Sequence, residues 1–147
     1  MLCEYFIAPD DASAALTLEW IGGPSNPPVG VLGFSTVQLP GLEPTVMMGT
    51  LDAILNGRSF EEVLADSSAH EVVSSGAAWV WALTTALQDA LVSSDDDRLS
   101  EAAGEWVMTE EFDGQADPAD AAAAVIALAQ MVRVGRDGGR LYCWFSL

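Results

Sequence analysis

Residues 117–147, DPADAAAAVIALAQMVRVGRDGGRLYCWFSL, contain the strongest structural signals in the chain. Asp117 and Pro118 indicate a helix start, because an Asp side chain accepts hydrogen bonds from free backbone N–H groups and Pro suits the first helical turn. An alanine-rich helix is therefore predicted over residues 121–134. A short Gly-rich turn follows, and the apolar run 141–147 predicts a buried terminal strand beside that helix.

The chain upstream alternates between apolar runs of strand length and stretches with helical periodicity. Residues 2–8 stop at Pro and Asp and predict a strand, and the alternating residues 16–21 predict a second one. The segment 22–28 is rich in Gly and Pro, which excludes regular structure there. Helices are predicted over residues 43–55, 60–65, 77–92 and 98–108, the second of them introduced by a capping box at Ser59 and Glu62.

This order of elements predicts an α+β fold. We expect a small mixed or antiparallel sheet, built from the N- and C-terminal strands and packed against four to five helices. The chain has 147 residues, 50% of them hydrophobic, which is enough for one core and too few for two ordinary domains. Residues 1–147 are therefore interpreted as a single domain.

The charge of the chain is strongly one-sided. Asp and Glu number 22 against 5 basic residues, all of them Arg, so the formal net charge is −17. A field of this sign repels nucleic-acid phosphates and anionic lipid headgroups and accelerates encounter with a basic partner. We therefore predict no nucleic-acid and no membrane partner. Two interpretations of the acids stay open: a solubilising surface, or recognition of a cationic protein.

The N-terminus and the two cysteines bear on the compartment. The chain begins without a basic leader and places an acid at Glu4, so no secretory signal is predicted, nor is a membrane span, and a cytoplasmic location is expected. Cys3 and Cys143 form no metal-binding or redox motif and are expected to be buried free thiols. Neighbouring strands would permit a disulfide between them, which a reducing compartment disfavours.

Few residues offer recognisable chemistry. His70 is the only histidine, which excludes sites built from a histidine pair within one chain, and no G-x-S-x-G motif exists to complete a triad with it. A calcium loop counted from Asp95 would need Gly and Glu where the chain has Ser100 and Trp106. We predict no catalytic, cofactor-binding or metal-binding residue. The looser alternative is a hard-cation site at the acid clusters 95–105 or 110–113, against the simpler role of solvated acids at helix ends.

The five tryptophans are candidates for both core and binding surface. Within the predicted helix 77–92, Trp79 and Trp81 lie two residues apart, so they are expected to point to different sides of it. One of them should then face a pocket, a second layer or a partner.

The layout resembles the YfbM-like family, small bacterial proteins of unknown function with a mixed α/β fold. The resemblance rests on the strand ending in Tyr5 and Phe6, the helix ending in LDAILNG at residues 51–57, and the C-terminal helix that runs directly into the last strand. Where that family tends to have Trp and His in its first helix, this chain has Met48 and Asp52. The resemblance implies the α+β fold and no functional residue.

Three functions are compatible with these observations. The first hypothesis is a non-catalytic acidic binding protein, of the immunity or inhibitor kind, that recognises a basic protein; its predicted contact residues are Trp81, Asp95, Asp96, Asp97, Glu101 and Glu105. The second is a small-ligand-binding or hydrolytic enzyme that uses carboxylates near Trp79 or Trp81. The third is a structural protein that forms homo-oligomers through an apolar face.

Overall fold

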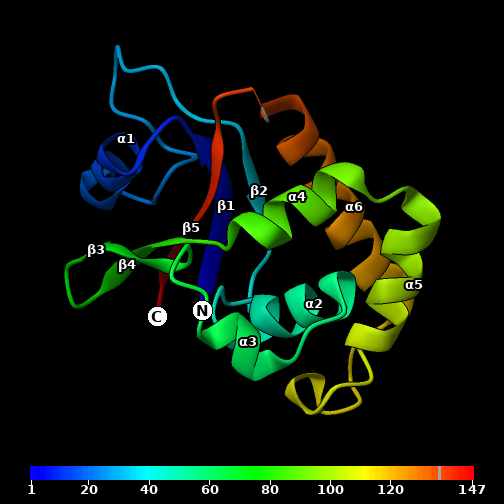
Figure 1. Cartoon of the computed structure of the whole chain (residues 1–147). Coiled ribbons are helices and arrows are strands. Elements are labelled where there is room, and N and C mark those ends of the chain that lie inside the picture. Colours follow the sequence, from blue (N-terminus) through cyan, green and yellow to red (C-terminus); the bar gives the residue numbers. More distant parts are fainter. Residues whose placement is uncertain (136) are drawn as a thin grey trace.

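The computed structural model describes residues 1–135 and 137–147, and its centre is one antiparallel sheet of five strands (Figure 1). The strand order is β2 (Thr36–Gln38), β1 (Leu2–Ala8), β5 (Arg140–Ser146), β4 (Ala78–Ala82) and β3 (His70–Ser74). The two ends of the chain thus supply the adjacent strands β1 and β5. The α+β class and the sheet built from terminal strands are confirmed.

Five helices lie on one side of this sheet (Figure 1): α2 (Val46–Asn56), α3 (Phe60–Leu64), α4 (Thr85–Ser93), α5 (Asp96–Trp106) and α6 (Pro118–Gly135). Side chains along each strand alternate between the two faces of the sheet, and Tyr5, Leu141 and Cys143 point toward the helices, into the core. Leu51 and Leu128 are fully buried in the same core. These five helices agree with the prediction of a sheet packed against four to five helices.

The opposite face of the sheet has a thinner cover. It consists of α1 (Asp11–Ala15), the 3₁₀ helix η1 (Leu16–Glu19) and the irregular segment that leads to β2. Phe6 and Tyr142 on the sheet stack at 5.7 Å, and Phe34 of the irregular segment packs on Phe6 and on Trp20. A second, smaller core therefore stabilises this face.

The predicted helix termini are largely confirmed. Asp117 accepts a hydrogen bond from the backbone N–H of Ala119 at 2.8 Å, as expected for the start of α6. Ser59 and Glu62 form both hydrogen bonds of the capping box of α3. The helix predicted over 43–55 begins at Val46, and the carboxylate of Glu43 caps its start by accepting hydrogen bonds from the backbone N–H groups of Thr45 and Met47.

The helix predicted over 77–92 is wrong in its first half. Residues Ala78–Ala82 form strand β4, and α4 starts only at Thr85 with Thr84 as its N-cap. The run is apolar on all sides, so periodicity does not separate a helix from a buried strand, and the bulky Trp79-Val80-Trp81 segment favours the strand. Trp79 and Trp81 consequently share one face of the sheet rather than opposite sides of a helix.

The strand predicted over 16–21 is also wrong. The side chain of Asp10 accepts a hydrogen bond from the backbone N–H of Ser13 and starts α1, and the chain continues into η1 instead of extending. The short edge strand β2 and the half-exposed β3 had no prediction. Strand β2 forms because it pairs with β1, which is distant in the sequence, whereas β3 forms a hairpin with β4 across residues 75–77.

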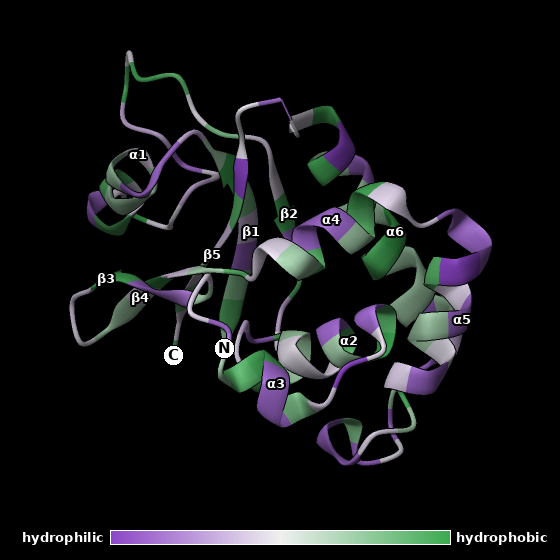
Figure 2. Cartoon of the chain, in the orientation of Figure 1, coloured by the Kyte–Doolittle hydropathy of each residue, from purple (hydrophilic) through white to green (hydrophobic). Residues whose placement is uncertain are grey.

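Helix α6 is long and apolar enough, by length and composition, to cross a membrane, and it is the one helix of the described residues for which this holds. Figure 2 shows the hydrophobic character of α6, in contrast to the hydrophilic outer end of the neighbouring α5. In the fold, one side of α6 is buried, including Val125, Leu128 and Val132. At its end, a Cβ on Gly135 would lie 2.7 Å from Ile7, so glycine permits the close packing of α6 on β1.

Candidate functional site

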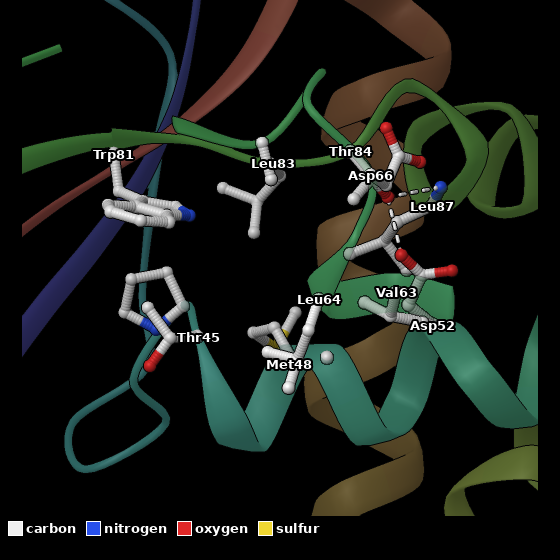
Figure 3. Close-up of a pocket in the computed structure, with 13 residues that line it drawn as sticks. Thr45, Met48, Asp52, Val63, Leu64, Asp66, Trp81, Leu83, Thr84 and Leu87 are labelled. Atoms are coloured by element: carbon white, nitrogen blue, oxygen red, sulfur yellow. Dashed lines mark hydrogen bonds between the residues drawn. The ribbon is translucent and has the colours of Figure 1, made fainter. Parts of the chain in front are cut away.

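A cavity of about 250 Å³ lies between β4, α2 and α3. Trp81 forms one end, and Asp52 and Thr84 form the other (Figure 3). Most of the wall is apolar, with Met48 and Leu83 between the two ends. Such a hollow has the apolar lining and few polar groups that are typical of small-ligand sites.

The local sequence explains how these side chains converge. Met48 and Asp52 are four residues apart, so they lie on the same face of α2. Helix α3 can approach α2 closely because position 49 is glycine, where a Cβ would stand 2.9 Å from the ring of Phe60. Trp81 enters from β4, on the face that looks toward the helices.

Asp52 is the polar end of the cavity and is almost fully buried, with 1% of its surface exposed. Its Oδ1 accepts hydrogen bonds from Asn56 at 2.8 Å and from Nε of Arg58 at 3.2 Å. Its Oδ2 accepts from Nη2 of Arg58 at 2.9 Å and from the hydroxyl of Thr84. Four hydrogen bonds from three residues therefore satisfy this carboxylate, and Arg58 carries the compensating charge.

Asp66 completes the same network. Its Oδ2 accepts from Nη2 of Arg58 at 3.0 Å, and its Oδ1 accepts from the hydroxyl and the backbone N–H of Ser68. The hydrogen bonds from Ser68 and the neighbouring guanidinium of Arg58 lower the pKa of Asp66 below its ordinary value. Both carboxylates at the cavity are thus engaged by protein donors, an arrangement suited to holding shape rather than to exchanging protons with a ligand.

His70 forms a second polar cluster on the other side of the sheet. Its Nε2 lies 2.7 Å from Oδ2 of Asp11, and its Nδ1 lies 3.1 Å from the carbonyl oxygen of Ser68. The hydroxyl of Tyr142 donates to Oδ1 of Asp11 at 2.7 Å. Hydrogen bonds from His70 and Tyr142 lower the pKa of Asp11. Because both ring nitrogens of His70 face protein acceptors, the cluster ties α1 to β3 and β5.

The cysteines lie on neighbouring strands, as the sequence allowed, and both are buried free thiols. Cys3 pairs with Phe145 and Cys143 with Tyr5, so the two thiols are diagonal neighbours on one face of the sheet. A hydrogen bond from Cys143 lowers the pKa of Cys3, whereas burial raises that of Cys143. Diagonal positions have Cα atoms about 7–8 Å apart, beyond the usual reach of a disulfide.

Helix α5 presents an acidic outer face. Asp97, Glu101 and Glu105 are exposed and recur every four residues, so they form one stripe along the helix. The opposite side is buried in the core through Leu99 and Trp106, whose indole Nε1 donates to the carbonyl of Met47 at 2.9 Å. An amphipathic helix of this kind displays carboxylates because its other side is needed for packing.

The structure does not bring all the predicted contact residues together. Asp95 caps the start of α5 by accepting from the backbone N–H of Arg98, and Asp96 lies 3.7 Å from Arg133. Both stand at the N-terminal end of the acidic stripe. Trp81 lies on the other side of the helical layer, with α2 and α4 between β4 and α5 (Figure 1). The acids of α5 and Trp81 therefore belong to separate surfaces.

Sequence reasoning missed the Asp52 network. The available signal was an acid on the otherwise apolar face of helix 46–56, followed six residues later by Arg58, one of only 5 basic residues in the chain. Among the residues that the structure describes, no group of three or more His, Cys, Asp or Glu side chains is placed to hold a metal ion.

No family model, curated protein or solved structure matches the chain. The similarity to the YfbM-like family therefore stays an expectation that rests on the residues given above. Function has to be inferred from the geometry of the surfaces and cavities.

Proposed function

We propose that this protein is a non-catalytic binding protein that recognises a basic protein partner, as an inhibitor or immunity protein would. The observation that carries this proposal is the acidic face of α5, the stripe formed by Asp97, Glu101 and Glu105. Carboxylates on one rigid helix give a partner a charged surface of defined geometry, which favours fast and specific encounter.

The sequence in and after α5 is densely acidic, which supports the proposal. Ten of the 22 acidic residues lie between residues 95 and 120, where Arg98 is the one basic residue: Asp95, Asp96, Asp97, Glu101, Glu105, Glu110, Glu111, Asp113, Asp117 and Asp120. Arg98 pairs with Glu101 at 2.9 Å, and the pair is exposed. The face thus keeps most of its negative charge.

The test compares two variants of equal net charge. The first carries Asp97→Asn, Glu101→Gln and Glu105→Gln on the acidic face, and the control carries Glu19→Gln, Glu61→Gln and Glu71→Gln at exposed positions elsewhere. Binding to a set of purified cationic proteins is measured by calorimetry at several salt concentrations.

We expect wild-type binding to weaken steeply with salt, because exposed charges are screened within about 10 Å at 0.1 M. The acidic-face variant should lose affinity at least about tenfold, or about 1.4 kcal/mol, while the control keeps it. Equal losses in both variants would show that only net charge matters, and salt-insensitive binding would contradict an acidic interface.

A second candidate is binding of a small apolar ligand in the cavity beside Trp81. An apolar cavity of about 150 Å³ in another protein is sufficient for benzene, and this one has about 250 Å³. Indole is a suitable probe, with its effect on the melting temperature as the measurement. Trp81→Ala should abolish the increase, whereas Trp79→Ala should not, because Trp79 stacks on Phe145 outside the cavity lining. No increase with the wild type would remove this candidate.

A further inference from the structure

The cavity beside Trp81 carries charge of one sign. Among the described residues that line it, two are acids, Asp52 and Asp66, and none is basic. Arg58 pairs with both acids from outside the lining, at 2.9 and 3.0 Å. One guanidinium against two carboxylates leaves one negative charge at the wall of this cavity. A hollow with apolar walls and an uncompensated anion favours a cationic ligand over a neutral one.

Asp66 is the acid that a ligand in this cavity can reach. Asp52 is 1% exposed, whereas the side chain of Asp66 keeps 20% of its surface exposed. Among the described residues, Oδ2 of Asp66 accepts a single hydrogen bond, from Arg58, and a carboxylate oxygen has room for two. Hydrogen bonds from Ser68 and the guanidinium of Arg58 lower the pKa of Asp66, so it is ionised at neutral pH. It therefore offers both a charge and a free acceptor position.

The charged and the apolar parts of the cavity lie at opposite ends. Asp66 belongs to the end where α4 begins, because Ser68 donates to Asp66 and its hydroxyl also accepts from the backbone N–H of Thr85 at 3.1 Å. Trp81 forms the other end, with Leu83 between the two (Figure 3). A ligand that fills this cavity thus meets an indole ring at one end and a carboxylate at the other.

The cavity is open to solvent and of limited size. Leu64, which lines it, keeps 63% of its surface exposed, so ligands have a path into it. In another protein a cavity of about 150 Å³ accommodates benzene, which has six carbon atoms. In proportion, the volume of about 250 Å³ found here accommodates about ten non-hydrogen atoms.

On the basis of the small-ligand candidate above, we propose that this cavity binds a primary amine joined by a short chain to an aromatic ring. Phenethylammonium, with nine non-hydrogen atoms, represents the class. Its ring packs against Trp81, and its ammonium group donates to Oδ2 of Asp66. The net charge of −17 concentrates such cations near the protein.

The probes separate the ring from the charge. They are phenethylammonium, its neutral counterpart phenethyl alcohol, the anionic phenylacetate, and methylammonium, which has the charge but no ring. Binding is followed at matched ionic strength by ¹H–¹⁵N NMR, through the backbone amide signals of the residues that line the cavity. These signals are available in the wild type and in each variant.

We expect saturable shifts with phenethylammonium and at least about tenfold weaker binding of phenethyl alcohol, because a hydrogen bond to a charged group is lost. Phenylacetate and methylammonium should bind more weakly still. Asp66→Asn keeps the shape and removes the charge, so it should weaken phenethylammonium binding about tenfold and leave phenethyl alcohol unchanged. Glu19→Gln removes an exposed charge elsewhere and should affect neither probe.

Three results would overturn the proposal. Equal affinity for phenethylammonium and phenethyl alcohol would refute the amine site and leave the apolar cavity as a binding site for neutral ligands. An equal response to methylammonium would mean that the ring is not bound. Absence of a response to every aromatic probe would remove both the amine site and the small-ligand candidate. The comparison of these probes in the wild type decides the matter even if Asp66→Asn fails to fold.

Discussion

Removal of the Asp52 carboxylate is the most demanding test of this structure. Asp52 joins α2 to the residues that follow it and to the start of α4, through hydrogen bonds from Asn56, Arg58 and Thr84. In Asp52→Ala, the hydroxyl of Thr84 loses its acceptor, and Arg58 loses both of its hydrogen bonds to Asp52. Arg58 keeps one partner, Asp66, at 3.0 Å.

The expected loss of stability follows from these contacts. Removing one partner of a buried ion pair costs about 3–5 kcal/mol, and the remaining pair with Asp66 puts this case near the lower end. With a urea m-value of about 2 kcal/mol/M, a loss of about 3 kcal/mol lowers the unfolding midpoint by about 1.5 M. Asp52→Asn keeps the shape and should cost about 1.5–3 kcal/mol, the range for a hydrogen bond to a charged group.

Urea unfolding followed by circular dichroism measures these differences. The control is Glu101→Ala, which removes the exposed pair with Arg98 and should cost less than about 1 kcal/mol. Equal midpoints for Asp52→Ala and Glu101→Ala would refute the reasoning, since they would mean that Asp52 is not a buried, charge-paired residue.

Three further predictions concern the backbone, alkaline pH and the thiols. Gly57→Ala should destabilise by about 1 kcal/mol because the residue ends α2 at φ 60°, whereas Gly104→Ala inside α5 should stabilise by about 0.5–1 kcal/mol; urea unfolding of the pair checks both signs. Burial raises the pKa of Tyr142, so the contribution of its protonated hydroxyl to folding stability is fully present below about pH 10 and is lost as pH rises further. The loss of stability above that pH should therefore be smaller in Tyr142→Phe than in the wild type, as measured by urea unfolding. Cys3 and Cys143 are 1% and 0% exposed and should react with a bulky disulfide reagent only after unfolding, and rapid labelling of the native protein would contradict their burial.

Local signals were reliable where a few neighbouring residues suffice to determine a conformation. The strand over 2–8, the capping box at Ser59 and the helix started by Asp117 are of this kind, because caps and turns depend on hydrogen bonds between residues a few positions apart. They failed for residues 77–92, where an unbroken apolar run fits either a helix or a buried strand.

The candidate sites were harder to predict for the same reason. The acids of α5 were found because charge is a property of composition, but their separation from Trp81 depends on where β4 lies in the sheet. The role of Asp52 depends on Thr84, which is 32 residues away.

By itself, the sequence determined the acidic surface, the α+β class and most of the helices. These follow from composition and from patterns within a few turns of chain. Only the tertiary structure decided which acids are satisfied, which tryptophans line cavities and how the two thiols lie relative to each other. The physical reason is that burial, charge pairing and strand pairing join residues far apart in the chain, so no local pattern contains them.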